Sequence, residues 1–303
     1  MNKYYDIIII GAGAAGMTAA LYSLRAGKTV CVFENEAIGG QIASSPRVEN
    51  FPSIKEISGS ELADNLFNQI QDLGAELELD MITSIDKEKD IFTVHGEYGD
   101  YDSKAVIIAT GAKHRHIGVA NEEKLIGKGV SYCAVCDGSF YKDQDVCLIG
   151  DANTALQYAL LLSNYCNKVY LCTLFDHFFG EKTLIDELYR HNNILITHNL
   201  LLQEFLFDDQ LYGLKFKDTQ TNEIKTFDVK ACFIAIGQVP HNEPFKNLVE
   251  LDKNGYIVTN EDMETKTKGL YAIGDCRSKK IRQLTTAVND GSIAAINACA
   301  YVK

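Results

Sequence analysis

The sequence predicts an α/β fold with two Rossmann-like (three-layer ββα) dinucleotide-binding domains, the second inserted in the first. Three observations predict this fold. A glycine-rich turn follows an apolar strand near the N-terminus, an altered copy of the pattern recurs mid-chain, and residues 105–111 and 231–237 echo each other. A repeated strand, glycine turn and helix is typical of dinucleotide-binding units. We therefore expect a first domain at 1–112 and 242–303, and an inserted domain at 113–241.

The composition predicts a globular protein of the cytoplasm. Hydrophobic residues make up 46% of the 303 residues, and no apolar run reaches the roughly 18 residues that a membrane span needs. With 29 basic and 41 acidic residues the formal charge is -12, which argues against binding to nucleic acid or to an anionic membrane. The nine cysteines fit a reducing compartment, and the start of the chain lacks the features of a cleaved leader.

The strongest motif lies at the start of the chain. A strand over Tyr4–Ile10 leads into Gly11-Ala12-Gly13-Ala14-Ala15-Gly16 and then into an Ala- and Leu-rich helix. In this pattern the first glycine permits a tight turn, the second lets a pyrophosphate approach the backbone, and the third lets the helix pack on the strand. The next strand, 28–33, ends at Glu34, whose carboxylate can accept a hydrogen bond from a ribose hydroxyl. Together these residues predict a dinucleotide site, with an ordinary glycine turn as the alternative.

The rest of the first domain follows the same architecture. A second glycine turn at Gly39-Gly40-Gln41 precedes the remaining elements of its N-terminal part. These are a helix over 59–73 and strands over 76–85, 91–94 and 105–109, the last ending in Thr110-Gly111. Near the C-terminus we expect a strand over 270–273 ending in Gly274-Asp275, and a final helix from Gln283.

The inserted domain repeats the first pattern with changes. We expect a strand over 145–149, a turn at Gly150, a helix over 156–163 and a strand over 168–172, followed by a strand meander over 200–227. The basic segment 113–116 is expected to be a solvated linker.

Cys133 and Cys136 are the candidate reactive groups. Two cysteines at this spacing can close a disulfide that a thiolate reopens. Asp137, the next residue, is the candidate acid or base for their thiolates. The alternative is half of a zinc site, but the second Cys pair or spaced histidine pair that such a site needs is absent from the sequence. We therefore expect no metal.

Taken in order, these motifs resemble the low-molecular-weight thioredoxin reductases from end to end. The resemblance implies FAD as cofactor, thioredoxin as partner and a homodimer. It also implies that Cys136 exchanges electrons with the flavin and that Cys133 attacks thioredoxin. The positions that the resemblance assigns to FAD binding are Gly11, Ala12, Gly13, Ala14, Ala15, Phe33, Glu34, Asn35, Gly39, Gly40, Gln41, Asn50, Ile82, Thr110, Gly111, Gly274, Asp275, Arg282 and Gln283.

The sequence departs from that family at the second nucleotide site. Ala152 replaces the second glycine, beside Asp151, and Thr173-Leu174-Phe175 with Phe179 replace the cations that hold the 2'-phosphate of NADPH. The loss predicts poor NADPH binding. In this respect the sequence resembles the ferredoxin-dependent flavin thioredoxin reductases. We therefore expect reduced ferredoxin as the electron donor.

Three alternatives to this reading keep the same fold. One is an NAD(P)H-dependent reductase with an unusual site, the second is an FAD-dependent dithiol oxidase, and the third is a non-catalytic FAD-binding sensor. If ferredoxin is the donor, Arg277, Lys279 and Lys280 are expected to form its docking surface, with a merely solvated loop as the alternative.

Overall fold

The computed structural model describes residues 2–45 and 48–303 and confirms the α/β fold class. The chain forms two compact units, one made of residues up to Lys113 and from Val239 onward, the other of His114–Gln238. The chain passes from one unit to the other at 113/114 and 238/239, where the sequence led us to expect 112/113 and 241/242. No helix in the described part of the chain is long and apolar enough to span a membrane.

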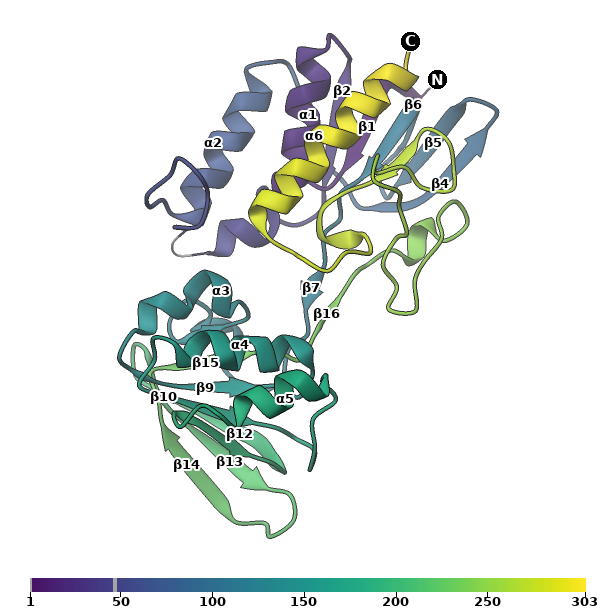
Figure 1. The fold of residues 1–303 in the computed structure, drawn as a ribbon. Helices are drawn as coiled ribbons and strands as arrows, with labels where there is room; N and C mark the ends of the chain where they lie inside the picture. The colour runs from purple at the N-terminus through teal and green to yellow at the C-terminus, as the bar shows by residue number, and fades with distance from the viewer. Residues whose placement is uncertain (1, 46–47) are drawn as a thin grey trace. The chain divides into compact units, whose positions relative to one another are not determined.

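A seven-stranded sheet forms the centre of the first unit (Figure 1). Its order is β3-β2-β1-β6-β5-β4, and β17 also pairs with β6. The strands β3, β2, β1, β6 and β17 run parallel, whereas β5 is antiparallel to both β6 and β4. The strands span Lys3–Ile10 (β1), Val30–Glu34 (β2), Glu76–Leu79 (β3), Ile82–Glu88 (β4), Ile91–Gly96 (β5), Asp100–Ile108 (β6) and Leu270–Ala272 (β17).

The apolar run of β1 arises because both faces of the strand are buried. Ile7 and Ile9 pack on the side of the helices, while Ile8 and Ile10 face a second core on the other side of the sheet. Residues 76–85, expected to be one strand, instead form two strands with different partners. The break lies at Asp80, whose buried carboxylate accepts hydrogen bonds from the backbone N–H groups of Glu97 and Tyr98.

Three helices accompany this sheet: α1 (Ala14–Arg25), α2 (Gly59–Gln71) and α6 (Leu284–Tyr301). Helices α1 and α6 lie side by side (Figure 1). They approach so closely that a Cβ atom on Gly291 of α6 would lie 2.4 Å from the carbonyl oxygen of Ala15. Helix α6 begins at Leu284, close to the predicted start, because Gln283 caps it in a reciprocal hydrogen-bonded box with Thr286.

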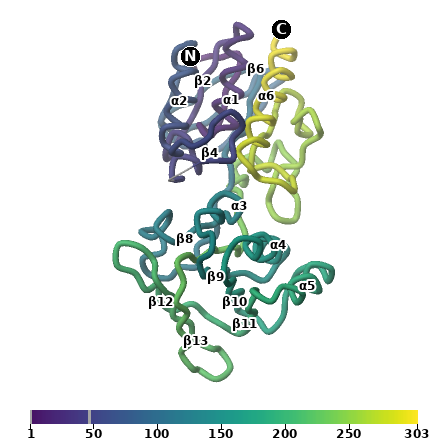
Figure 2. Tube along the Cα trace, turned by 60° about the vertical axis from the view of Figure 1, so that its left-hand side comes forward, coloured from purple at the N-terminus to yellow at the C-terminus, as the bar shows by residue number. Residues whose placement is uncertain are grey.

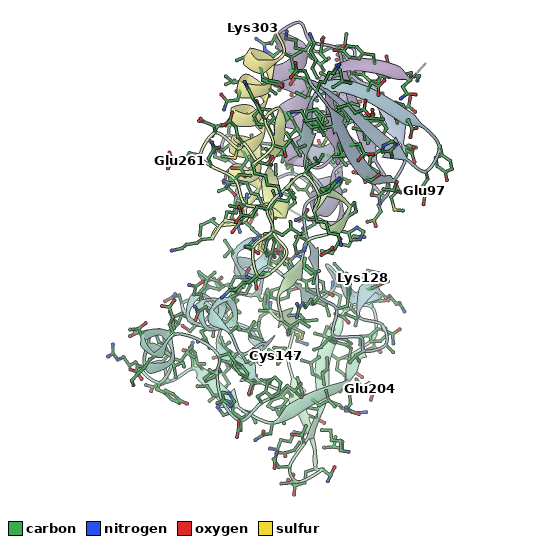
Figure 3. All side chains as sticks on the ribbon, turned by 90° about the vertical axis from the view of Figure 1, so that its right-hand side faces the viewer. Glu97, Lys128, Cys147, Glu204, Glu261 and Lys303 are labelled. Atoms are coloured by element: carbon green, nitrogen blue, oxygen red, sulfur yellow. A yellow bond between two sulfur atoms is a disulfide. The ribbon has the colours of Figure 1, made fainter. Side chains whose placement is uncertain are left out.

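The second unit has the three-layer ββα form (Figure 2). Its parallel sheet has the order β11-β10-β9-β15-β8 and is covered by helices on one face and by the antiparallel sheet β12-β13-β14 on the other. Cys147 of β9, labelled in Figure 3, is fully buried in the core between the two sheets. The elements span Val130–Ser131 (β8), Asp145–Ile149 (β9), Lys168–Cys172 (β10), Ile194–Thr197 (β11), Leu200–Phe207 (β12), Leu211–Asp218 (β13), Ile224–Asp228 (β14), Ala231–Ile234 (β15), Ala134–Asp137 (α3), Asn153–Ser163 (α4) and Lys182–Leu188 (α5).

Candidate active site

The first glycine turn joins β1 to α1, and two of its glycines are required by packing. Gly11 has φ 112°, and a Cβ atom there would lie 2.4 Å from the carbonyl oxygen of Ala109. A Cβ atom on Gly16 would lie 1.9 Å from the carbonyl oxygen of Gly11. The backbone of this turn is held in addition by a 2.7 Å hydrogen bond from Gly11 N to Phe33 O. Only glycine fits at these two positions.

Gly13 is different, because it faces open space. It is the N-cap residue of α1, and a Cβ atom on it would meet no atom of the protein within 4 Å. The following residues, Ala14 and Ala15, are buried under the turn. The N-terminus of a helix of this length attracts an anion. The open space at Gly13 therefore fits a pyrophosphate, which a larger side chain would displace.

Glu34 ends β2 and is buried beside this turn. Its Oε2 accepts a hydrogen bond from Ala12 N at 2.9 Å, and its Oε1 accepts from the backbone N–H groups of Asn35 and Glu36, each at 2.9 Å. A carboxylate has about four lone-pair sites, so it can accept a further bond from a ribose hydroxyl. A pocket of about 190 Å³ opens here, lined by Glu34, Asn35, Glu36, Leu79, Asp80, Met81, Glu97 and Tyr98. Glu97 lies at the margin of the first unit (Figure 3).

Asp275 follows β17 in the same unit, and a Cβ atom on its neighbour Gly274 would lie 3.0 Å from Ala15 Cβ. The Oδ1 atom of Asp275 is buried and forms no hydrogen bond with the described residues, with Lys279 Nζ at 3.5 Å as its ion-pair partner. Burial raises the pKa of Asp275, and the charges of Lys279 and Arg282 oppose that rise. A buried carboxylate oxygen without a hydrogen bond is costly in a folded protein. It is therefore suited to accept a hydrogen bond from a polar ligand.

Two of the three cations proposed as a ferredoxin-docking surface do not form one. The side chains of Arg277 and Lys279 are largely buried, with 16% and 8% exposed, and both bind the buried carboxylate of Asp290. Only Lys280 of the three is exposed. The sequence suggested a basic surface because the partner of these cations, Asp290, is distant in the chain and lies almost two turns into α6. The expectation of a docking surface at these residues is wrong.

The remaining residues assigned to FAD lie in the same unit. Gly39 N donates to Ala12 O at 2.8 Å, which joins the two glycine turns, and Gln41 Nε2 donates to the carbonyl oxygen of Ala112. Asn50 Nδ2 lies 3.4 Å from Gln283 Oε1. The other positions form the turns or strands around them: Phe33, Gly40, Ile82, Thr110, Gly111, Gly274 and Arg282.

The turn after β9 keeps the backbone of a nucleotide site but not its surface. Ala152 is the N-cap residue of α4, with φ -107° and ψ 176°. Gly13, the N-cap residue of α1, has a similar extended conformation, with φ -77° and ψ 177°. The methyl group of Ala152 is exposed where Gly13 leaves open space. The segment after β10 lies against this turn, because Phe179 N donates to Asp151 O at 2.8 Å and Glu181 N to Asn153 Oδ1 at 2.7 Å.

Aromatic and acidic side chains cover the carboxyl end of β10. Phe175 and Phe179 are exposed and meet edge to face with ring centroids 5.3 Å apart. Asp176 Oδ1 lies 2.6 Å from His177 Nδ1, and this hydrogen bond lowers the pKa of Asp176. Thr173 is buried and bonded to His198 at 2.7 Å. Residues 173–180 contain no lysine or arginine, so this segment supplies no permanent cation for a phosphate.

The cysteine pair lies in the second unit, between β8 and α4. Cys133 and Cys136 form a disulfide with their Cα atoms 5.3 Å apart. Cys133 caps the single turn of α3, and its Sγ accepts a hydrogen bond from Cys136 N at 3.2 Å. The disulfide supports the redox interpretation of the pair over the zinc alternative.

Asp137 ends α3 and lies next to this disulfide in the chain. Burial raises the pKa of Asp137, while a 2.6 Å hydrogen bond from Ser131 Oγ to Asp137 Oδ2 lowers it. A raised pKa favours the protonated form of this carboxyl group, which is the form that can donate a proton. Ser131 was not singled out in the sequence, because a serine two residues before a cysteine carries no distinctive signal.

A second hydrogen-bonded group surrounds Tyr132, which precedes Cys133. Its hydroxyl donates to the buried Glu122 Oε1 at 2.7 Å and lies 3.0 Å from His116 Nδ1. His114 stacks on the Tyr132 ring with centroids 4.8 Å apart. Burial and the nearby His116 lower the pKa of His114 to about 4. Segment 113–116 is therefore only partly the solvated linker that we expected.

Known proteins resemble this chain along almost its whole length. Residues 5–291 match the model of the family described as pyridine nucleotide-disulphide oxidoreductase. The chain belongs to this family. It is 39% identical over 304 residues to a 34.2 kDa protein in the rubredoxin operon of Clostridium pasteurianum, covering 99% of this chain and 98% of that protein.

Relatives named thioredoxin reductase are nearly as similar. The thioredoxin reductase of Listeria monocytogenes is 38% identical over 303 residues, which cover 100% of this chain and 95% of the relative. The crystal structure of thioredoxin reductase from Streptococcus pyogenes matches with a TM-score of 0.95 at 36% identity, over 99% of both chains. The chain is therefore a thioredoxin reductase-like flavoprotein disulfide oxidoreductase, and its cofactor is FAD.

The residues of the first unit fit FAD. Gly13 leaves space for the pyrophosphate, Glu34 can hold the adenosine ribose, and Asp275 Oδ1 has a free lone pair for a ribityl hydroxyl. When bound, FAD supplies the redox chemistry that side chains lack. The protein's part is to hold the cofactor and to provide the disulfide.

Proposed function

We propose that this enzyme reduces thioredoxin through the disulfide Cys133–Cys136. Cys136 receives electrons from the flavin, and Cys133 is the thiol that attacks the disulfide of thioredoxin. Asp137 supplies and recovers the proton that these steps need. The observation that carries the proposal is the disulfide itself, which lies in a capped helical turn next to the half-buried carboxyl group of Asp137.

We also propose that the electron donor is a nicotinamide without a 2'-phosphate, namely NADH. The family description refers to pyridine nucleotides and the relatives are named thioredoxin reductase, which favours a nicotinamide donor and gives no support to ferredoxin. Within the family site, residues 173–180 lack cations. The negative charge of Asp176 would repel a 2'-phosphate and could accept a hydrogen bond from a ribose hydroxyl. The exposed rings of Phe175 and Phe179 offer a surface on which adenine can pack.

Reduced ferredoxin is the second candidate donor, and one observation favours it. The exposed methyl group of Ala152 occupies the position at which Gly13 leaves room for a pyrophosphate, and such a methyl group opposes every dinucleotide, NADH included. A one-electron carrier would pass electrons to the flavin without using this turn.

The resemblance to thioredoxin reductases further suggests that the enzyme is a homodimer in the cytoplasm.

Turnover of thioredoxin separates this function from the dithiol oxidase and the non-catalytic sensor. The FAD-loaded enzyme is mixed with oxidised thioredoxin and NADH without oxygen, and free thiols are measured over time. Many thiols formed per enzyme support a reductase. Oxygen-dependent consumption of thioredoxin dithiol instead of its formation would assign the chain to the oxidases, and the absence of both reactions would leave the sensor.

A further inference from the structure

Ser131 is in contact with both ends of the redox segment. It is the last residue of β8 and is 5% exposed. Its Oγ donates a 2.6 Å hydrogen bond to Asp137 Oδ2 and accepts a 3.1 Å hydrogen bond from Cys133 N. One hydroxyl group therefore links the carboxyl group to the backbone of the first cysteine.

We propose that Ser131 is a positioning residue, which holds Asp137 for proton transfer to the cysteine pair and stabilises the carboxylate that remains. The proposal rests on the proposed role of Asp137 as proton donor. Ser131 itself exchanges no electrons and no net proton. Its contribution is a hydrogen bond to a charged product, which is stronger than one to a neutral group.

Reduction of the Cys133–Cys136 bond by two electrons, which bound FAD would supply, breaks the bond and places a negative charge on each sulfur. A proton passes from the carboxyl group of Asp137 to one sulfur, which leaves a thiol, a thiolate and the Asp137 carboxylate. When the pair reduces the disulfide of thioredoxin, the electrons leave with that substrate. The proton of the remaining thiol then returns to Asp137, and the two thiolates of thioredoxin take one proton each from solvent.

The surroundings of Asp137 make the hydroxyl of Ser131 important. Tyr141, from the 3-10 turn Gly138–Tyr141, and Tyr158 of α4 face the carboxyl group, and burial together with Asp137 raises the pKa of each tyrosine. Both phenols therefore stay neutral at physiological pH, and neither supplies a compensating charge. Burial raises the pKa of Asp137, and the hydrogen bond from Ser131 is the interaction that lowers it. Loss of this bond should shift the titration of Asp137 to higher pH.

The decisive test titrates Asp137 directly in the oxidised, FAD-loaded enzyme. The ¹³C NMR signal of its carboxyl carbon is identified by its disappearance in Asp137→Asn and followed with pH in the wild type, Ser131→Ala and Ser131→Thr. We expect Ser131→Ala to raise the midpoint by about one pH unit or more. Ser131→Thr keeps the hydroxyl and should restore the wild-type midpoint. Ser139→Ala, an exposed serine two residues beyond Asp137, is the matched control and should change nothing.

A kinetic readout completes the test. The rate at which reduced thioredoxin forms should fall at high pH, and Ser131→Ala should move this alkaline limb upward by the same amount as the NMR midpoint. In the Asp137→Asn background, Ser131→Ala should have no further effect on the pH profile. An unchanged NMR midpoint in Ser131→Ala would overturn the inference. Because that titration needs neither thioredoxin nor an electron donor, it can fail while the proposed function stands, and the reverse also holds.

Discussion

The buried carboxylate of Asp290 binds the guanidinium of Arg277 through two hydrogen bonds, from Nε to Oδ2 at 2.9 Å and from Nη2 to Oδ1 at 3.1 Å. Lys279 Nζ donates to the same carboxylate at 3.1 Å, and Gly274 N does so at 3.1 Å. This group anchors the segment that carries Asp275 to helix α6. The position of Asp275 therefore depends on a carboxylate fifteen residues further along the chain.

Asp290→Ala should destabilise the protein by about 3 kcal/mol or more, because it leaves the largely buried Arg277 without its ion pair with Asp290 and leaves Lys279 with only its pair to Asp275. Chemical denaturation at neutral pH measures the free energy of unfolding. Glu261→Gln, at an exposed position marked in Figure 3, is the control and should change it by less than about 0.5 kcal/mol. Equal effects of the two substitutions would contradict the role given to Asp290.

The same carboxylate predicts how stability depends on pH. Burial alone would raise the pKa of Asp290, but the hydrogen bonds and charges of Arg277 and Lys279 lower it overall. Because the folded-state pKa is lower than the unfolded-state pKa of about 3.9, this stabilisation is present above that value and is lost as the pH falls through the folded-state pKa. The difference in unfolding free energy between wild type and Asp290→Asn should therefore shrink as the pH is lowered below about 4. A difference that stays constant down to pH 2 would contradict the ion-pair explanation.

Gly13 and Gly11 should respond differently to a larger side chain. Gly13→Val should fold normally and lose FAD, because the side chain enters space that the protein leaves open. Gly11→Val should impair folding even without cofactor, because φ is 112° and the new Cβ would clash with Ala109. Flavin absorbance after purification and thermal unfolding of the apoproteins measure the two effects. A Gly13→Val protein that is still yellow, and so still binds FAD, would show that the pyrophosphate does not lie at this position.

Replacing Cys133 and replacing Cys136 should give different observable products. Cys133→Ser should leave Cys136 as a thiolate beside oxidised flavin, with a long-wavelength charge-transfer absorbance. Cys136→Ser should leave Cys133 able to form a stable mixed disulfide with thioredoxin, visible by mass spectrometry under non-reducing conditions. The reverse pattern would exchange the two roles.

The donor site offers a gain-of-function test. Replacing Phe175 and Phe179 together with arginine should raise kcat/KM for NADPH relative to that for NADH by about tenfold or more, because guanidinium groups form charge-assisted hydrogen bonds with a phosphate. Tyr189→Arg, at an exposed position of the same unit, is the control for added positive charge. If the control raises the ratio equally, the effect is one of net charge and the site is not at β10.

The comparison of sequence with structure shows which features local patterns can predict. The run of isoleucines in β1 and the glycine spacing after it specify a buried strand and a phosphate turn, because both depend on neighbouring residues. The burial of Lys279 could not be predicted in this way, since its partner Asp290 is brought to it by the packing of α6. The break at Asp80 and the bond between Ser131 and Asp137 likewise depend on tertiary contacts. From a short segment of sequence, charged or polar residues are predicted to be solvent-exposed, because their partners in the folded chain are not known.

The central claim is that electrons from NADH pass through FAD and the Cys133–Cys136 disulfide to thioredoxin, and one anaerobic measurement tests it most directly. The absorbance of the flavin and the formation of thioredoxin dithiol are followed together, with NADH, NADPH or reduced ferredoxin as the only donor. We predict that NADH bleaches the flavin and supports many turnovers, with kcat/KM at least about tenfold above that of NADPH, since the cations for a 2'-phosphate are missing. Turnover with NADPH as fast as with NADH would contradict the account. Bleaching by reduced ferredoxin without any bleaching by either nicotinamide would also contradict it, and would establish the second candidate in its place.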